Sequence, residues 1–237
     1  MSHPALDVLA IGNAIVDVIA VADDRFLEGE GLTKGSMRLI DAAEASGLYD
    51  RMAQGRETSG GSAANTVAGV AALGLKAGFV GRVAPDQLGD VFRHDIRSLG
   101  VHFDTAAGPA EPPTARCLIL VTPDAQRTMN TFLGASQHLS ADDIDAGLIR
   151  SAKILYLEGY LWDPEAPRAA MRQAIETARA AGNKVAFTLS DGFCVDRHRA
   201  DFRELIETGK IDILFANEHE ACSLTQTGDF ETAAAWL

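Results

Sequence analysis

The sequence predicts an α/β fold, a three-layer α/β/α sandwich in which helices cover both faces of a central, mostly parallel β-sheet. Short apolar runs alternate along the chain with longer amphipathic segments, the pattern of strands joined by helical crossovers. Most of the runs are rich in β-branched or aromatic residues, which is typical of strands buried on both faces. With 237 residues, 47% of them hydrophobic, the chain is long enough for one such domain, residues 1–237.

The strands and helices of this domain follow from the hydrophobic pattern. Strands of the main sheet are expected at residues 6–11, 78–83, 153–157, 185–189 and 211–215. Helices are expected at residues 62–73, 87–99, 164–181 and 202–207. The third helix has the clearest ends, because Pro164 suits a first helical turn and Gly182 suits a C-terminal stop.

Two stretches, at about residues 15–40 and 101–132, break the alternation. Extended segments follow one another there with Gly, Pro and Asp turns between them, and some neighbours have no helix between them. The expected strands are residues 16–21, 37–40, 116–121 and 127–132. Together they predict a small antiparallel sheet inserted into the main domain, placed to act as a lid over a ligand.

Composition restricts the classes of partner. The 33 acidic and 21 basic residues give a net charge of −12, which opposes a broad electrostatic grip on nucleic acid or an anionic membrane. The three cysteines, Cys117, Cys194 and Cys222, are scattered and odd in number, which argues against a disulfide framework or a zinc site. The N-terminus has no secretory pattern, and no apolar run reaches membrane-spanning length. We therefore expect a soluble cytoplasmic protein with a small-molecule ligand.

The segment GGSAAN, from Gly60 to Asn65, is the first candidate binding element. It is predicted as a polar loop that ends in two glycines and opens into a helix, so that backbone N–H groups can approach a ligand hydroxyl or anion. Asn65 lies about one helical turn further on, where its amide can share the same site. The alternative is a glycine pair that only lets a small-residue helix pack closely on a strand. The spacing matches neither a Walker loop nor a dinucleotide-binding turn.

The segment GNAIVD, at the end of the first strand, supplies Asn13 and Asp17. An aspartate within an apolar stretch is costly to bury unless its carboxylate accepts hydrogen bonds, and sugar hydroxyls can donate them. The alternative is that Asp17 caps a turn or faces solvent. Arg127, at a turn before an expected lid strand, can neutralise phosphoryl charge or can be an ordinary surface cation.

The segment NEHE places Asn217 and Glu220 one helical turn apart, directly after the last expected strand. Hard oxygen ligands at this spacing suit hydrated Mg²⁺, which keeps most of its waters. The alternative is an N-cap with a capping box at the start of a helix, and spacing alone favours it.

Taken in order, GNAIVD, GGSAAN and IDILFANEHEA resemble the PfkB-type carbohydrate kinase family, also called the ribokinase family, over residues 6–224. KGSMRLID and FTLSDGFC make the adenosine kinase branch the most similar. The resemblance implies a ribokinase-like fold and an ATP- and Mg²⁺-dependent transfer of a phosphoryl group to the primary hydroxyl of a nucleoside, adenosine-like, or of a sugar. The residues it implies for the acceptor are Asn13, Asp17, Gly60, Gly61 and Asn65, with Tyr160 near a nucleobase. It also implies Arg127 beside the transferred phosphoryl group, and Asn217 and Glu220 at the cofactor, with Glu220 holding Mg²⁺ through water.

The family's Gly-Ala-Gly-Asp segment, which carries the general base and the anion hole, does not occur in this sequence. We therefore expect a C-terminally incomplete kinase domain that is inactive alone and exposes apolar surface beside residues 211–215. Two alternatives remain: a non-catalytic module that binds a sugar or nucleoside, and a kinase of a plain sugar such as ribose or fructose. The sequence allows either a monomer or a homodimer.

Overall fold

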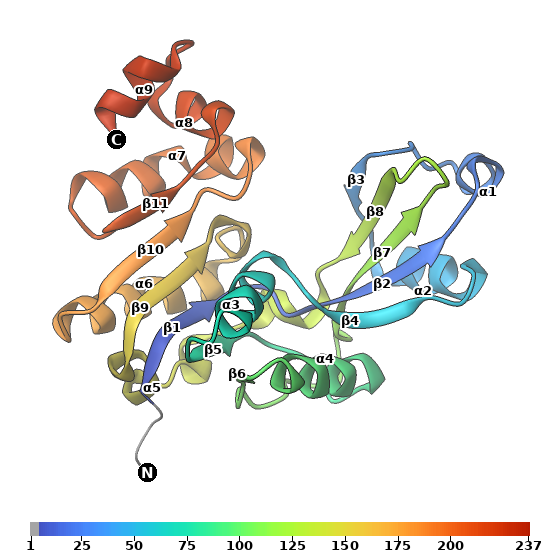
Figure 1. Ribbon diagram of the computed structural model, residues 1–237, viewed down its shortest axis with the longest axis horizontal. Coiled ribbons are helices and arrows are strands. Elements are labelled where there is room, and N and C mark those ends of the chain that lie inside the picture. Colours follow the sequence, from blue (N-terminus) through green and yellow to red (C-terminus); the bar gives the residue numbers. More distant parts are fainter. Residues whose placement is uncertain (1–4) are drawn as a thin grey trace.

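The computed structural model describes residues 5–237. Its larger sheet has six strands, all parallel, in the order β11-β10-β9-β1-β5-β6 (Figure 1). The strands are β1 (Leu6–Ile11), β5 (Ala77–Val80), β6 (Val101–His102), β9 (Ala152–Glu158), β10 (Lys184–Thr188) and β11 (Ile213–Phe215). The predicted parallel sheet is confirmed, and the short strand β6 is an addition to it.

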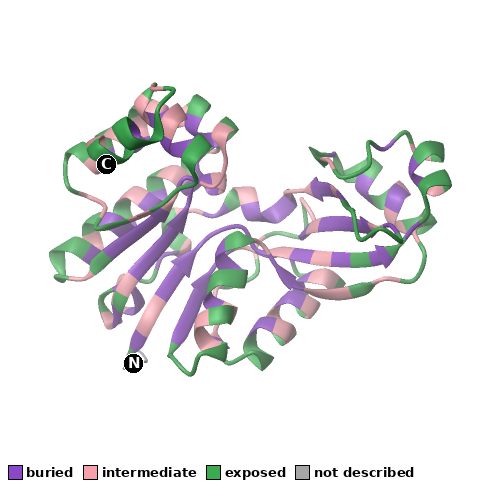
Figure 2. Ribbon diagram, turned by 45° about the horizontal axis from the view of Figure 1, so that its top comes forward, coloured by how far each residue is buried: buried purple, intermediate pink, exposed green. Residues whose placement is uncertain are grey.

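Alternate residues of the central strands enter two separate hydrophobic cores. In β9, Leu155 and Leu157 join one core, and Tyr156 between them joins the other. The first core is completed by α5 (Ala146–Ser151), α6 (Glu165–Ala180) and α7 (Gly192–Glu207), and the second by α3 (Ser62–Ala72) and α4 (Gln87–Ser98). Figure 2 shows burial concentrated along the central strands. The three-layer sandwich is therefore confirmed, because each face of the sheet has its own helices.

The second sheet has five strands in the order β3-β8-β7-β2-β4. They are β2 (Ile15–Val21), β3 (Met37–Leu39), β4 (Arg56–Gly60), β7 (Ala115–Val121) and β8 (Arg127–Phe132). The expectation of an antiparallel sheet is wrong in part: β2 pairs with β7, and β3 with β8, in parallel. The connection from β2 to β7 and the connection from β3 to β8 both pass through the main domain, so each pair of strands can run parallel. We call this sheet, with the helices α1 (Asp24–Gly29) and α2 (Ala42–Arg51), the lid (Figure 1).

Several boundaries differ from the expectations. The helix expected at residues 202–207 is α7, which begins ten residues earlier at Gly192, because its charged stretch from Asp196 to Arg199 hides the apolar periodicity. Two further helices, α8 (Glu218–Thr225) and α9 (Phe230–Trp236), follow β11. Short 3-10 helices are η1 (Gly134–His138), η2 (Ala141–Asp143) and η3 (Gly159–Leu161). No helix of residues 5–237 is both long and apolar enough to cross a lipid bilayer.

Strand β11 lies at one edge of the main sheet and is poorly covered. The side chains of Ile213 and Phe215 are 37% and 51% exposed, although each belongs to a strand of an otherwise buried sheet. This confirms the expectation of exposed apolar surface beside residues 211–215. An unpaired strand edge with apolar side chains can accept a further strand.

Candidate functional site

The two candidate acceptor segments meet where the main sheet joins the lid. Strand β2 runs antiparallel to β4, and this register sets Asp17 opposite Thr58, two residues before Gly60. A Cβ atom on Gly60 would lie 2.4 Å from the Asp17 Cγ, so only glycine lets the carboxylate lie so close. Asp17 and Gly60 therefore share one surface, which we call the acceptor cradle together with Gly61 and Asn13.

Gly61, the second glycine, is required by its backbone conformation and by a close contact with another backbone atom. Gly61 has φ +96°, and a Cβ atom there would lie 2.4 Å from the backbone oxygen of Asn13. Gly61 is also the N-cap of α3, and it has no side chain with which to cap the helix. The expectation of a polar loop here is wrong, because Gly60 ends strand β4 and Gly61 leads directly into α3. The pattern RETSG is too polar to predict a strand, and it pairs through its backbone at the edge of the lid sheet.

The Asp17 carboxylate is partly buried and lacks a hydrogen-bond donor from the described part of the chain. Burial raises its pKa from 3.8 to about 6, and the positive charge of Arg127 acts in the opposite direction. Within residues 5–237 no side chain or backbone N–H donates a hydrogen bond to this carboxylate. Its lone pairs can therefore accept hydrogen bonds from the hydroxyl groups of a ligand.

Arg127 begins strand β8 and is exposed. Its charge lowers the pKa of Asp17 and also opposes the rise to about 11 that burial imposes on the thiol of Cys117. Cys117 pairs with Asp17 across β2 and β7. Arg127 therefore lies within electrostatic range of the cradle, and its role beside a transferred phosphoryl group stays a prediction.

Asn13 is brought to the cradle but is buried, with 2% of its surface exposed. Its side-chain amide donates to Glu158 Oε1 at 3.0 Å, and its Oδ1 accepts from Ser136 Oγ at 2.8 Å. The backbone N–H of Asn13 also donates to Glu158 Oε1, at 2.6 Å. The amide thus has protein partners at both ends, and direct contact with a ligand stays a prediction.

Glu158 is the residue that the sequence reasoning missed. It ends β9, its side chain is buried, and its carboxylate faces the start of α3, where Ala63 N–H donates to Oε2 at 2.9 Å. One signal could have found it: a lone acidic residue directly after the apolar run 154–157, at the carboxyl edge of a parallel sheet, where ligands bind in such folds.

Asn65 and Tyr160 belong to the two helices next to Glu158, Asn65 to α3 and Tyr160 to η3. Asn65 is in the first turn of α3, its N–H donates to the carbonyl oxygen of Gly61 at 2.9 Å, and its side chain is exposed. Tyr160 follows β9 in η3, and its hydroxyl donates to the carbonyl oxygen of Ser190 at 3.0 Å. Burial raises the pKa of Tyr160, and the negative charge of Asp191 adds to the effect. The Tyr160 hydroxyl is thus engaged at the β10–α7 connection, and its role near a nucleobase stays a prediction.

Asn217 and Glu220 form a capping box at the start of α8, as the spacing favoured. Glu220 N–H donates to Asn217 Oδ1 at 2.8 Å, and Asn217 N–H donates to Glu220 Oε2 at 3.2 Å. The Asn217 amide also donates to Glu220 Oε1 at 2.7 Å. Each oxygen of Glu220 therefore keeps a lone pair, so the pair can cap the helix and still accept a hydrogen bond from a water of hydrated Mg²⁺.

Replacing Asn217 by alanine removes the side-chain half of this box. We expect the free energy of unfolding to fall by about 1 kcal/mol, the usual cost of a lost N-cap. Urea unfolding followed by circular dichroism measures the change. Glu218→Gln is the matched control, because Glu218 is in the same first turn but outside the box. Equal effects of the two substitutions would contradict the structural role of Asn217.

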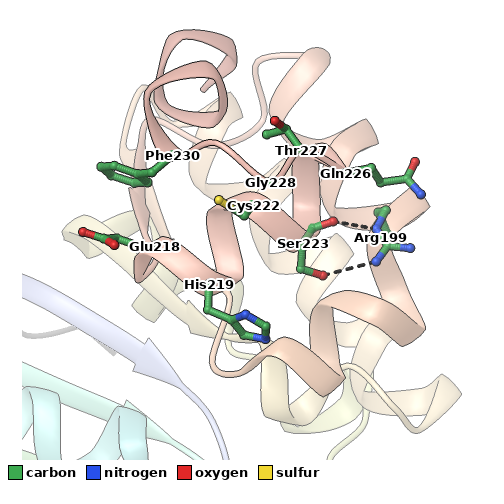
Figure 3. Close-up of a pocket in the computed structure, with 9 residues that line it drawn as sticks. All are labelled: Arg199, Glu218, His219, Cys222, Ser223, Gln226, Thr227, Gly228 and Phe230. Carbon is green, nitrogen blue, oxygen red and sulfur yellow. Dashed lines mark hydrogen bonds between the residues drawn. The ribbon is translucent and has the colours of Figure 1, made fainter.

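A hollow of about 830 Å³ opens beside this capping box. It lies over α8, between α7 and α9, and Glu218, His219 and Phe230 line one part of it (Figure 3). Arg199 closes the other part, where its guanidinium donates to the backbone and the hydroxyl of Ser223. Within residues 5–237 no group of three His, Cys, Asp or Glu side chains is arranged to hold a metal ion. The hollow therefore contributes no direct metal ligand set.

Known proteins share this fold. A model of the pfkB family carbohydrate kinases matches residues 6–237. A probable sugar kinase from Rhizobium etli CFN 42 has a solved structure that is 52% identical, covers 98% of this chain and 70% of its own, and has a TM-score of 0.89. An adenosine kinase from Sinorhizobium meliloti is also 52% identical, covers 97% of this chain and 70% of its own, and has a TM-score of 0.87.

A curated relative is the 5-dehydro-2-deoxygluconokinase of Shouchella clausii (strain KSM-K16). It is 33% identical over 186 residues, which are 77% of this chain and 50% of that kinase. The chain spans about half the length of the curated relatives that it matches.

Proposed function

The chain belongs to the PfkB family of carbohydrate kinases, and from this membership we propose that it provides the acceptor site of an ATP-dependent phosphotransferase. The acceptor is a primary hydroxyl group on a nucleoside or a sugar. The observation that carries the proposal is the acceptor cradle, where an aspartate that receives no hydrogen bond from residues 5–237 lies against Gly60. A carboxylate beside a glycine-lined surface suits the hydroxyls of a pentose, which donate to the carboxylate and accept from backbone N–H groups.

An adenosine-like nucleoside is the favoured acceptor. The adenosine kinase of Sinorhizobium meliloti is 52% identical over nearly the whole chain, so its acceptor is the first to consider here. Ile19 and Val21 alternate with Asp17 along β2 and therefore share its face of the lid sheet, with 38% and 74% of their surface exposed. These apolar side chains can cover a nucleobase beside a pentose held at Asp17, whereas ribose or fructose would leave them exposed.

The phosphoryl donor and metal follow from the family chemistry. ATP supplies the γ-phosphoryl group, and Mg²⁺ supplies positive charge that offsets the charge developing on it. Glu220, with its remaining lone pairs, would hold the hydrated ion through water, and Asn217 would keep that carboxylate in place. Arg127 would stabilise charge on the phosphoryl group from the lid side. We propose no metal ligand beyond these, and either a monomer or a homodimer in the cytoplasm.

Binding and transfer test this proposal separately. Calorimetric titration of the 237-residue chain with adenosine, ribose and fructose is expected to show the tightest binding for adenosine. Transfer from [γ-³²P]ATP is then assayed with this chain and with a version extended at its C-terminus through a Gly-Ala-Gly-Asp segment, because the chain spans about half of its curated relatives. The extended version is expected to phosphorylate at least one acceptor. Its inactivity on all three would defeat the kinase proposal, and binding without transfer would support a non-catalytic binding module.

A further inference from the structure

Glu158 occupies an unusual position for a charged residue, because 1% of its surface is exposed. Its donors come from both segments that form the cradle. Oε1 accepts from the backbone N–H and the side-chain amide of Asn13, at 2.6 and 3.0 Å. Oε2 accepts from Ala63 N–H at 2.9 Å, and the Ser62 side chain donates as well. A single carboxylate therefore joins three elements that are far apart in sequence: the end of β1, the start of α3 and the end of β9.

The chemistry of this position calls for an ionised carboxylate. Burial raises the pKa of Glu158, and the N–H donors of Asn13 and Ala63 act in the opposite direction. Both oxygens face N–H groups, so a proton on either oxygen would place a donor against a donor. Glutamine has the same shape but only one acceptor oxygen, so its NH₂ group would face either Asn13 or Ala63. The position thus distinguishes glutamate from its closest isostere.

The contacts of Glu158 also explain the missing cap of α3. Gly61 is the N-cap and has no side chain, and Ala63 is the second residue of the helix, whose N–H a cap side chain usually satisfies. Glu158, at the end of β9, caps α3 instead, and its negative charge lies at the positive N-terminal end of the helix. The packing is close, because a Cβ atom on Gly12 would lie 2.8 Å from Glu158 Cδ and 2.6 Å from Ala63 Cβ.

We propose that Glu158 is a positioning residue for the acceptor. It fixes Asn13 and the first turn of α3 so that Gly61 and Asn65 stay in register with Asp17, and it acts through these groups without touching the ligand. This inference rests on the proposed function of the cradle. Substitution of Glu158 should therefore change acceptor affinity, although its carboxylate is inaccessible to the ligand.

The test compares Glu158→Gln with the wild-type chain and with a matched control, Asp201→Asn. Asp201 is also a carboxylate that accepts from a buried group, the indole N–H of Trp162 at 2.8 Å, but it is itself partly exposed, and Trp162 belongs to the core on the other face of the sheet. Adenosine affinity is measured by calorimetry at pH 8, and the backbone amides of Asn13, Gly61 and Ala63 are followed by ¹H–¹⁵N NMR. We expect Glu158→Gln to weaken adenosine binding at least about tenfold. Those amide resonances are expected to shift in Glu158→Gln. In Asp201→Asn we expect an adenosine affinity within about twofold of the wild-type value and the same amide resonances at their wild-type positions.

The outcomes separate the inference from the function on which it rests. Wild-type affinity in a folded Glu158→Gln variant would overturn the positioning role and leave the proposed function standing. A wild-type chain that binds none of adenosine, ribose and fructose would overturn both. If Glu158→Gln does not fold, Ser136→Ala loosens Asn13 on its other side, since it removes the Ser136 Oγ donor to Asn13 Oδ1 at 2.8 Å and leaves only the longer bond from Gln137 Nε2 at 3.5 Å. A several-fold loss of affinity in Ser136→Ala supports the positioning role, and unchanged affinity overturns it.

Discussion

Replacing Asp17 by asparagine is expected to abolish acceptor binding and at the same time to stabilise the fold. The carboxylate accepts hydrogen bonds from ligand hydroxyls, and each bond to a charged acceptor contributes about 1.5 to 3 kcal/mol. Loss of two such bonds weakens binding at least about a hundredfold. In the free protein the same charge is partly buried with no donor from residues 5–237, so its removal relieves a cost of folding.

The size of that cost follows from the pKa of Asp17, which burial raises from 3.8 to about 6. The folded protein holds the proton to a higher pH than the unfolded chain does, so the free energy of unfolding falls as pH rises from about 4 to about 6. An increase of this size in pKa corresponds to about 3 kcal/mol. Asparagine is itself polar, so we expect Asp17→Asn to raise the free energy of unfolding by about 1 to 2 kcal/mol at pH 8, measured by urea unfolding.

Acceptor affinity is expected to have its own dependence on pH. Only the ionised carboxylate accepts from two hydroxyls, so the association constant of the wild-type chain should fall by up to tenfold per pH unit below about 6. Calorimetric titrations between pH 5 and pH 8 measure this directly. A flat profile for the wild-type chain would contradict the assignment of Asp17 as the acceptor carboxylate.

Asp124 provides a control of opposite sign within the same lid. It lies in the turn between β7 and β8, where hydrogen bonds from Lys34 and Thr122 lower its pKa to about 2. Its ionised form therefore stabilises the fold above about pH 4, and this stabilisation is lost as pH falls toward 2. Asp124→Asn is expected to lower stability at pH 8 and to leave acceptor affinity unchanged. Stabilisation by both substitutions would indicate a general effect of net charge.

The parts of this site that could be predicted from sequence are those set by local contacts. Asn217 and Glu220 are three residues apart, so their spacing alone indicated the capping box that the structure contains. The central strands of the main sheet are buried on both faces, so their apolar runs also predicted them correctly. In both cases the residues that determine the structure are neighbours in the chain.

The parts that could not be predicted depend on distant contacts. Glu158 lies 145 residues from Asn13 and 95 from Ala63 in the sequence. No local pattern therefore predicts that its carboxylate accepts hydrogen bonds from their N–H groups. Strand β4 was missed for a related reason, because its polar residues join an edge through the backbone and through Asp95 of α4, which accepts from Thr58 and Ser59. Tertiary pairing overrides weak local preference at such positions.

Replacing Gly61 by alanine is expected to lower the free energy of unfolding more than any other substitution that adds one methyl group to the cradle. The backbone there, with φ +96° and ψ 147°, is one that residues with a Cβ atom rarely adopt, and this strain costs about 1 to 3 kcal/mol. The new Cβ would also lie 2.4 Å from the Asn13 carbonyl oxygen, and a backbone atom cannot rotate away as a side chain can. We expect a loss of at least about 3 kcal/mol in the free energy of unfolding.

Acceptor binding should be lost together with this stability, because the end of β1 and the start of α3 can no longer approach. Gly182→Ala is the matched control: φ is +78° there as well, but no atom lies within 4 Å of the position of the new Cβ. It should cost about 1 kcal/mol from backbone strain and leave adenosine affinity unchanged. Gly60→Ala adds a graded case, because its clash is with the Asp17 side chain, which can rotate away at the expense of binding. If Gly61→Ala binds adenosine as tightly as Gly182→Ala does, the close approach of the two segments is not what forms the cradle.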